Sequence, residues 1–553
     1  MSLMTSADIQ AQARGLLARD RVGQAVRLAL DHGLDDLAAE LLAHGWVGMV
    51  CGAAEFEGFF EAIERIGSQR YRHWPQLEAA SIYALTMQLH LRIAALRLDE
   101  LEQRVPALLR ENRSFLVEHQ RAPFDRPDPR DGMYSWIAMM RVAQAAFGGR
   151  SEDALRLADD WRTRFARAPD HEFATVAVNE ALALSMLDRT REAEREALAA
   201  LRIFRRVRFE HGMVSAAVCA GCMKALSGRV NDAAALLDAA FDEAAPRLAQ
   251  APETRASLDV ARNFTAFERG DIEAALADAM DRIEGRRPSP RLPVMLLIDR
   301  FVAARALMAL GRAHQAAALL ARPDLERPAG DWRFWDQLLT LERVRVAAVC
   351  GDYSGIDGPP DVLALLKLLT LAQRNPSAIA LAALRKMVRE AEDRQQESRL
   401  FMALLMKARV EQHTGNSLQA RRSVTRLITA PMLRERLGSL ASLAPALQPM
   451  FGDALRGLLE ASGNRDERLL RLARLTGVAV EAAAEAGAPA EPLSPREEQI
   501  GAALLEGLSN RQITQRIHLS EQTVRWHLWK LFQKLGVSNR LGAAQRLSSR
   551  RPN

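Results

Sequence analysis

The residues with the clearest chemical meaning in this chain are arginines and lysines close to its C-terminus. Residues 493–553 hold ten Lys/Arg and four Asp/Glu, and this net charge of +6 equals the formal charge of all 553 residues. The rest of the chain therefore holds equal numbers of basic and acidic side chains. A basic segment attached to an electrically balanced chain indicates a polyanionic partner, and double-stranded DNA is the first candidate.

Short helices are predicted to position these charges. Ser494 and Pro495, followed by Glu497 and Glu498, form a helix start, because a hydroxyl cap, a proline in the first turn and acidic side chains all suit a helix N-terminus. Two further helices are predicted over 510–517 and 521–535. Their inward-facing residues recur at spacings of three and four: Ile513, Ile517, Val524, Leu528, Leu531 and Leu535.

The helix predicted over 521–535 is roughly 22 Å long at 1.5 Å per residue, which suits the major groove. Because Val524 and Leu528 face inward, and positions three and four apart share a face, the other side of this helix faces outward. That outward face holds Gln522, Arg525, Trp526, Trp529, Lys530 and Gln533. Arginine, glutamine and lysine can bond to base edges or to phosphates.

This segment resembles the LuxR-type helix-turn-helix domain of bacterial transcription regulators. The resemblance rests on the opening Leu493-Ser494-Pro495-Arg496-Glu497, on Gly507-Leu508-Ser509-Asn510-Arg511, on Ser520-x-x-Thr523-Val524-Arg525-x-His527 and on Lys534-Leu535-Gly536-Val537. It implies that 521–535 is the recognition helix and 510–517 the positioning helix. It also implies base contacts at Arg525 and Trp526. The full set of expected DNA-binding residues is Ser509, Asn510, Arg511, Gln522, Thr523, Arg525, Trp526, His527, Trp529 and Lys530.

Position 529 departs from the family pattern, which usually has a basic or small polar residue where Trp529 stands. A tryptophan here is compatible with packing on thymine methyls or deoxyribose. It is equally compatible with docking against the rest of the protein when DNA is absent. Both readings stay open, and the base preference of a relative does not transfer to this chain.

The same resemblance implies that two such domains pair on DNA through the helix over 540–547. We expect dimerisation through Arg540, Ala543, Ala544 and Leu547, and hence a two-fold-symmetric operator. The expected partners are double-stranded DNA, a second copy of the chain, RNA polymerase, and an effector that is a small molecule, a peptide or a protein.

A repeated turn organises the long segment that precedes the basic end. The pattern Gly-x-x-x-x-Ala occurs at Gly33/Ala38, Gly149/Ala154, Gly228/Ala233, Gly270/Ala275, Gly311/Ala316 and Gly415/Ala420. Counting relaxed forms at 188 and 351, successive starts from 149 to 351 are 39 to 42 residues apart. Glycine suits the left-handed residue after a helix, and alanine lets the next helix pack closely. The pattern predicts about nine or ten stacked helix pairs.

The predicted fold is therefore all-α: a superhelical array of tetratricopeptide-like helix hairpins of about 40 residues, followed by a four-helix LuxR-type domain. The predicted boundaries are 1–68 for an N-terminal part of the array, 69–462 for the repeats, 463–492 for a linker and 493–553 for the DNA-binding domain. The spacing shortens between 351 and 375, where the array is expected to be irregular.

The array also resembles the sensor region of large LuxR-family regulators of the maltose-operon activator type. Those relatives have an ATP-binding domain in front, with a Gly-x-x-x-x-Gly-Lys-Ser/Thr loop. The chain contains no Gly-Lys pair. Either this lineage does without nucleotide, or the chain is part of a longer protein.

Enzyme chemistry is not expected. The sequence has no Ser/His/Asp, paired-carboxylate or phosphate-loop pattern, so we predict no catalytic residues and no cofactor. Cys219 and Cys222 form a CxxC inside a helix, for which we favour packing over a redox pair or a zinc site, because no second ligand pair accompanies it. No apolar run reaches membrane length and no signal peptide is apparent, so we expect a cytoplasmic protein.

Two features of the array are candidate effector sites. Aromatic residues Tyr134, Trp136, Trp332 and Trp335 lie on helices predicted to line its concave side. We favour packing between repeats for them. Arg202, Arg205, Arg206 and Arg208 gather at one helix end, and we interpret them as solvated surface rather than an anion site. The predicted function is sequence-specific transcription regulation by a signal-receiving array. The alternative is an interaction scaffold that regulates a partner protein.

Overall fold

The structure is a computed structural model of the whole chain. It describes residues 5–19, 21–51, 53–72, 74–87, 90–111, 129–187, 189–248, 251–290, 293–322, 333–350, 378–393, 397–479, 493–506, 508, 510–517, 519, 521–535, 543 and 547. Within these ranges every regular element is a helix and none is a strand. The all-α fold predicted from the sequence is confirmed. The chain forms two compact units, residues 1–458 and 459–553.

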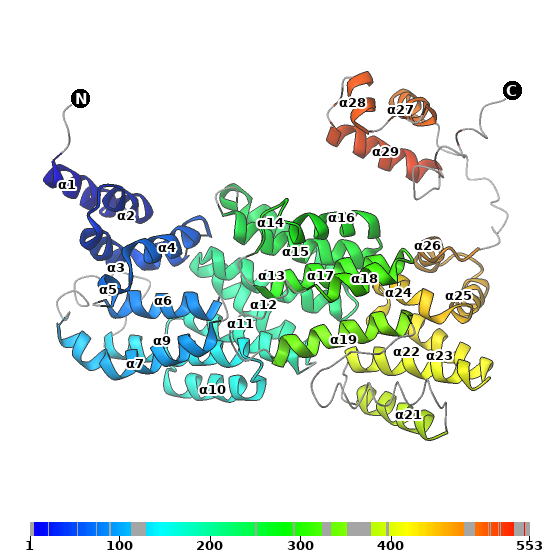
Figure 1. Cartoon of the computed structure of the whole chain (residues 1–553), viewed down its shortest axis with the longest axis horizontal. Coiled ribbons are helices and arrows are strands. Elements are labelled where there is room, and N and C mark those ends of the chain that lie inside the picture. Colours follow the sequence, from blue (N-terminus) through cyan, green and yellow to red (C-terminus); the bar gives the residue numbers. More distant parts are fainter. Residues whose placement is uncertain are drawn as a thin grey trace. The chain divides into compact units, whose positions relative to one another are not determined.

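The first unit is a succession of helices (Figure 1), and short turns join many of the helices that follow one another within the described ranges. Its first helices are α1 (Ser6–Leu17), α2 (Val22–Asp31), α3 (Asp35–Cys51), α4 (Ala53–Ile66), α5 (Ser68–Tyr71), α6 (Pro75–Met87), α7 (Leu91–Glu111), α9 (Pro129–Phe147), α10 (Ser151–Arg164), α11 (Asp170–Met186) and α12 (Thr190–Val207). They are followed by α13 (Glu210–Leu226), α14 (Val230–Leu248), α15 (Pro252–Arg269), α16 (Ile272–Ile283), α17 (Pro293–Ala309), α18 (Ala313–Leu320), α19 (Arg333–Cys350), α21 (Ala378–Asp393), α22 (Glu397–His413) and α23 (Ser417–Thr429).

The repeated glycine turn is confirmed. All six glycines of the Gly-x-x-x-x-Ala pattern have a positive φ, between 68° at Gly33 and 97° at Gly270. All six alanines that follow are at most 1% exposed. A side chain on the glycine would be strained in this backbone conformation, and a larger residue at the alanine would separate the two helices. Each turn therefore reverses the chain and lets the next helix return against the previous one.

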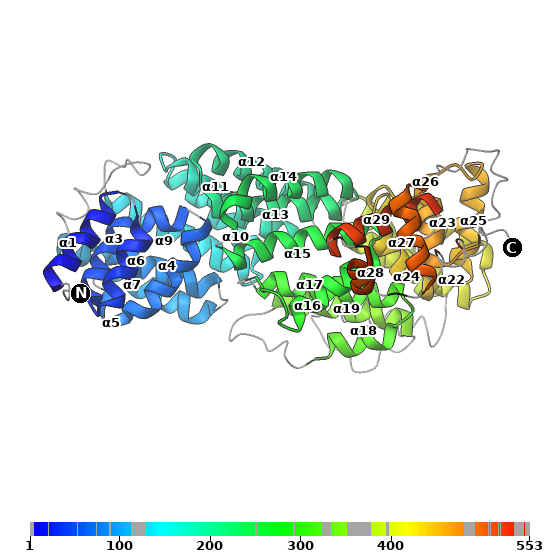
Figure 2. The same cartoon turned by 90° about the horizontal axis from the view of Figure 1, so that it is seen from above.

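Helices of the array form an inner and an outer layer. The odd-numbered helices α9, α11, α13, α15, α17 and α19 each contact the next odd-numbered one, whereas the even-numbered helices pack chiefly on their odd-numbered neighbours (Figures 1 and 2). α13 accordingly buries residues on all sides, from Gly212 to Ala225. The outer helix α12 buries one stripe that includes Ala193, Ala197 and Phe204. Burial on all sides is expected of a helix between two layers, and a single apolar stripe of a helix at the surface.

Residues 431–447, here named the docked segment, pack across the inner helices. The docked segment consists of the 3-10 helix η1 (Pro431–Leu433), α24 (Leu437–Leu443) and the 3-10 helix η2 (Ala444–Leu447). α24 contacts α15 and α17, while η2 contacts α17, α19 and α22. Every residue of α24 is buried. The segment thus belongs to the core of the array, although it lies far along the chain from α15 and α17.

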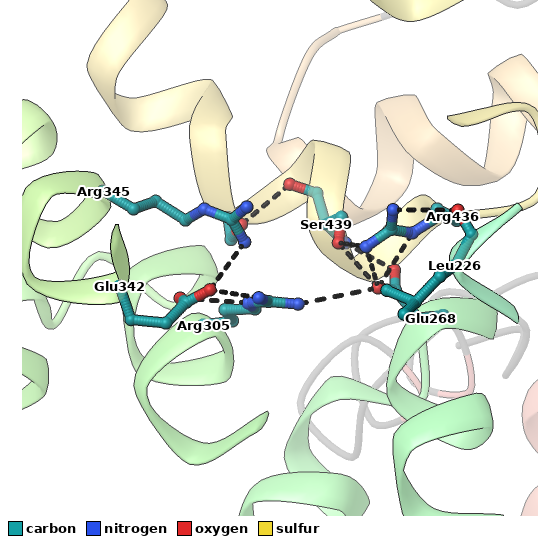
Figure 3. A network of polar contacts seen from close by, with 8 residues as sticks. Leu226, Glu268, Arg305, Glu342, Arg345, Arg436 and Ser439 are labelled. Carbon is teal, nitrogen blue, oxygen red and sulfur yellow. Dashed lines mark hydrogen bonds and ion pairs between the residues drawn. The ribbon is translucent and has the colours of Figure 1, made fainter. Parts of the chain in front are cut away.

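A buried polar cluster fixes the docked segment (Figure 3). Glu268 of α15 is fully buried, and its carboxylate accepts hydrogen bonds from Arg436 Nη2 at 2.9 Å, from Ser439 Oγ at 2.7 Å and from Ser439 N at 3.0 Å. Arg436 Nη1 also donates to the Leu226 carbonyl at 3.3 Å. Burial alone would raise the pKa of Glu268, but Arg436 and Arg305 beside it hold that pKa below its ordinary value.

The cluster continues into α19. Arg305 of α17 pairs with Glu342, and Arg345 lies 3.4 Å from the same carboxylate. Burial and the like charge of Arg305 lower the pKa of Arg345 to about 9. Three guanidinium groups therefore share two carboxylates in the interior of the array. Removing one partner from such a group leaves a buried charge without its counterion, which is strongly destabilising.

The second unit holds the C-terminal helices. α25 (Met450–Ala461) connects the two units and α26 (Glu467–Thr476) follows it, before α27 (Pro495–Leu505), α28 (Asn510–Ile517) and α29 (Glu521–Leu535). The segment predicted as a linker thus begins with a helix, α26, which is capped by the Asp466 side chain. Residues 480–492 lie outside the described residues. In the described part of the chain, no helix is both long enough and apolar enough to cross a membrane.

Candidate nucleic-acid interface

α27, α28 and α29 form a small domain around one apolar core. The buried core residues are Ile500, Ala503, Leu504, Ile513, Val524, Leu528, Leu531, Ala543 and Leu547. α28 and α29 have the bounds predicted from the sequence, and the residues predicted to face inward are buried or partly buried wherever their side chains are described. Spacings of three and four among apolar residues therefore identified the inner face correctly.

Polar contacts at the start of α27 tie the domain together. Ser494 and Glu497 form the predicted cap: Ser494 Oγ accepts from the Glu497 backbone N–H, and the Glu497 carboxylate accepts from the Ser494 N–H at 2.8 Å. Lys534 of α29 donates to the same carboxylate at 2.8 Å. Burial would raise the pKa of Glu497, but these hydrogen bonds lower it to about 2. One carboxylate thus links the start of α27 to α29.

The outward part of α29 presents two stripes of predicted DNA-binding positions. Thr523, His527 and Lys530 follow one another at i, i+4 and i+7, so they share a flank of the helix, and all three are partly exposed. Positions 522, 526 and 529 have the same i, i+4, i+7 spacing. They lie on the side of the helix that is opposite to the buried Val524 and Leu528. Position 525 lies beside them. The helix backbone therefore places seven of the ten expected residues on its outward part.

Several expected residues have side chains that lie outside the described part of the structure. These are Asn510 and Arg511 at the start of α28 and Gln522, Arg525, Trp526 and Trp529 of α29, for which the helix backbone alone is described. Ser509, Arg540 and Ala544 lie outside the described residues altogether. The two roles considered for Trp529 stay open.

Ala543 and Leu547, expected at a dimer interface, are buried in the core of their own domain. Ala543 is 0% exposed and Leu547 9% exposed. The Leu547 side chain packs closely against Gly501 of α27, where a Cβ would lie 3.2 Å from Leu547 Cδ1. The side chains of Ala543 and Leu547 thus contribute to the core that contains Ile500 and Leu504 of α27, and pairing through residues 540–547 stays a prediction.

Comparison with protein families decides the nature of this domain. Residues 491–547 match the model of the bacterial regulatory proteins of the luxR family. Residues 491–547 are a LuxR-family domain. The matched segment contains α27, α28 and α29 together with Ala543 and Leu547. The family resemblance drawn from the sequence motifs is confirmed.

Two curated relatives each match a short part of the chain. The "Probable transcriptional regulatory protein SgaR" of Hyphomicrobium methylovorum is 50% identical over 52 residues, which are 9% of this chain and 25% of that protein. The "Transcriptional regulatory protein UhpA" of Escherichia coli (strain K12) is 39% identical over 57 residues, or 10% of this chain and 29% of that protein. The chain thus spans between a quarter and a third of the length of these relatives.

A solved structure also matches part of the chain. It is the Rap conjugation gene regulator of the plasmid pLS20 in complex with a Phr peptide, with a TM-score of 0.34 and 15% sequence identity. The match covers 62% of this chain and 97% of that chain.

The aromatic effector candidates of the array have packing roles where they are described. Tyr134 and Trp136 of α9 are partly buried and pack on a core cluster that includes Ile137 and Trp161. Ser135 between them is buried, and Trp161 Nε1 donates to its carbonyl at 3.0 Å. Trp332 lies outside the described residues, and for Trp335 the helix backbone alone is described. The contacts around Tyr134 and Trp136 favour packing between repeats.

The CxxC pair lies inside α13. Burial raises the pKa of both Cys219 and Cys222 to about 12, and Cys219 adds to the shift at Cys222. A thiol with such a pKa stays protonated at neutral pH, which disfavours nucleophilic and metal-binding roles. Among the described residues there is also no group of three or more His, Cys, Asp or Glu arranged to hold a metal ion. The packing interpretation is favoured.

Proposed function

We propose that this chain is a sequence-specific DNA-binding transcription regulator. The match of residues 491–547 to the luxR family carries the proposal, and both curated relatives are named as transcriptional regulatory proteins. The charge of residues 493–553 supports it, since this segment supplies the whole net positive charge of the chain. In this proposal α29 enters the major groove, Arg525 and Trp526 contact bases, and Thr523, His527 and Lys530 approach phosphates.

Selection from random DNA duplexes by the purified full chain tests the proposal. We expect one recurrent sequence motif from the unmodified chain and none from Arg525→Ala. Arg496→Ala is the matched control, because Arg496 is an exposed residue of α27 whose guanidinium bonds to Gln499. It removes the same unit of charge from the same domain, away from α29. Absence of any enriched motif with the unmodified chain would refute sequence-specific binding and favour the interaction scaffold.

Pairing of two chains on DNA is a second part of the proposal. We propose that two LuxR-family domains pair through residues 540–547, with Ala543 and Leu547 anchoring that segment to α27 from inside. A paired regulator recognises a two-fold-symmetric site whose halves are about one helical turn apart. The selected motif should therefore be palindromic, and the mass of the complex should correspond to two chains per site. A non-repeating motif bound by one chain would contradict pairing.

The array is proposed to receive the signal that governs the DNA-binding domain. The stacked helix pairs provide an extended surface of the kind on which repeat proteins bind small molecules, peptides or proteins. Measuring DNA affinity in the presence and absence of a candidate effector tests this role. An effector that binds the array and leaves DNA affinity unchanged would separate the two activities.

A further inference from the structure

An open cleft of about 770 Å³ lies where the array meets the docked segment. One wall consists of α12 and the turn between α13 and α14. The other wall consists of Pro431 of η1 together with Arg434 and Glu435. Protein cavities that take small ligands have volumes of about 300–1,000 Å³. Both walls belong to the first unit, so the cleft is a feature of the array itself.

The cleft carries an excess of positive charge. Its lining contains four arginines, Arg191, Arg195, Arg229 and Arg434, against two glutamates, Glu194 and Glu435, which leaves a net charge of +2. Both glutamates are engaged inside the protein. The buried Glu194 pairs with Lys224 at 2.9 Å and with Arg229, and Glu435 Oε2 accepts from the Asn231 N–H at 2.9 Å.

Two of the arginines come from different walls of the cleft and are exposed. Arg191 belongs to α12 and has no hydrogen-bond or ion-pair partner among the described residues, while Arg434 belongs to the docked segment. A guanidinium group offers paired N–H donors that match the oxygens of a carboxylate or a phosphate. Leu198 and Pro431 add apolar surface to the same lining. The cleft thus combines the size, charge and donors that a small acidic molecule requires.

We propose that this cleft binds a small ligand whose carboxylate or phosphate groups lie between Arg191 and Arg434. The assignment rests on the proposed role of the array as receiver of a signal, and it gives that signal a chemical class. Because one arginine is on α12 and the other on the docked segment, the ligand binds the docked arrangement and no other. Its binding therefore stabilises docking of residues 431–447.

The polar cluster around Glu268 makes this effect specific. Arg436, which bonds to Glu268, lies two residues after Arg434. A ligand that holds Arg434 against α12 consequently restrains the backbone that presents Arg436 and Ser439 to Glu268. A ligand with selective affinity for one of two states shifts the population toward that state. Ligand binding thereby changes how firmly residues 431–447 are docked, and these residues lie in the part of the chain that leads to the LuxR-family domain.

Hydrogen–deuterium exchange of the full chain tests the proposal without DNA. The probes are citrate and inorganic pyrophosphate, each compared with sodium chloride at equal ionic strength. With a probe at about ten times its Kd, exchange in residues 431–447 should slow about tenfold. The double variant Arg191→Ala/Arg434→Ala should lose this protection. Arg202→Ala should keep it, because Arg202 is an exposed residue of the same helix, α12, outside the cleft.

The outcomes separate the ligand classes and the two proposals. Protection by citrate alone identifies a carboxylate ligand, and protection by pyrophosphate alone a phosphorylated one. Equal protection of the double variant, or no protection of the unmodified chain by either probe, would overturn the cleft as a ligand site. Since DNA is not involved in this measurement, failure here leaves DNA binding by the LuxR-family domain intact, and failure of the duplex selection leaves the cleft intact.

Discussion

Single side chains of α29 are expected to act on DNA in two different ways. Arg525 and Trp526 occupy positions from which the family contacts bases, whereas Thr523, His527 and Lys530 share the flank that we propose to approach phosphates. A contact to a base edge is gained on one sequence and lost on others. A contact to a phosphate is made on every sequence and releases counterions. The two groups can therefore be told apart by measurement.

Arg525→Ala and Lys530→Ala should have distinguishable effects on affinity. We expect Arg525→Ala to weaken binding to the selected motif by about 1–3 kcal/mol and to leave binding to unrelated duplexes nearly unchanged. Lys530→Ala should weaken all duplexes alike and reduce the slope of log K against log salt by about 1. Fluorescence anisotropy at several salt concentrations measures both. An equal loss on every duplex for Arg525→Ala would remove that residue from base reading.

Glu497 should make the stability of the DNA-binding domain depend on pH. Its pKa of about 2 in the folded domain lies below the ordinary value of 4.5. The stabilisation is therefore fully present above pH 4.5 and is lost as the pH falls toward 2. We expect Glu497→Gln to destabilise α27–α29 by about 1 kcal/mol at pH 7, because the ion pair with Lys534 is lost. The difference should disappear near pH 2.

Hydrogen exchange of the peptides that contain α27 and α29 would measure this effect, and Glu498→Gln is the control. Glu498 is the next residue of the same first turn, but it is exposed. Equal exchange in Glu497→Gln and Glu498→Gln at pH 7 would mean that the contact of Glu497 with Lys534 contributes nothing to the stability of the domain.

Glycines in the elements of the array differ in whether, and why, a side chain is excluded. Gly270 ends α15 with a φ of 97°, a conformation that a side chain would strain. Gly438 of α24 has no such backbone constraint, yet a Cβ there would lie 2.2 Å from the Phe267 carbonyl oxygen. The docked segment thus touches the backbone of α15 directly. Gly15 of α1 has nothing within 4 Å and is required by neither effect.

Gly438→Ala should loosen the docked segment. The obstacle is a backbone oxygen, which cannot move aside without disturbing α15, so we expect a loss of about 1–3 kcal/mol in the free energy of unfolding. Exchange in residues 431–447 should become faster. Gly15→Ala is the control, and it should raise stability by about 0.5–1 kcal/mol because alanine favours the helix. Thermal unfolding and hydrogen exchange measure both variants. Unchanged exchange in Gly438→Ala would show that the docked segment can accommodate a methyl group at position 438.

The molecule as a whole keeps its net positive charge in one segment. Residues 1–492 hold equal numbers of basic and acidic side chains, and residues 493–553 carry +6. Non-specific attraction to DNA should therefore arise from this segment. We expect the fragment 493–553 and the full chain to show the same slope of log K against log salt on a random duplex, about 0.9 per phosphate contacted. A steeper slope for the full chain would assign phosphate contacts to the array.

Local signals in the sequence predicted much of this molecule. Glycine followed five residues later by alanine predicted the turns at Gly33 and Gly270, and Ser494 with Glu497 predicted the start of α27, because each of these features depends on neighbouring residues alone. Pairing in three dimensions was not accessible in this way. Glu268 and Arg436 are 168 residues apart in the chain, and no repeat or spacing links them.

The arginines of the array illustrate the same limit. In the sequence, arginines gather at the end of α12. The structure pairs two of them there, Arg205 with Glu243 and Arg206 with Asp170. Those partners support the interpretation of that cluster as a solvated surface. The cleft lies at the opposite end of the helix, around Arg191. It was not predicted because its second wall comes from residues after 430, which fold back onto the array.

The late position of the docked segment in the chain has a consequence for biosynthesis. Glu268 leaves the ribosome 168 residues before Arg436, which corresponds to roughly 10–30 s at typical rates of translation. During that interval the inner helices α17 and α19 are added but lack the segment that covers them, and the apolar surface that α24 will cover is open to water or to a chaperone. Docking closes this surface shortly before the LuxR-family domain is synthesised. A nascent chain is thus assembled around its own core before it is able to reach DNA.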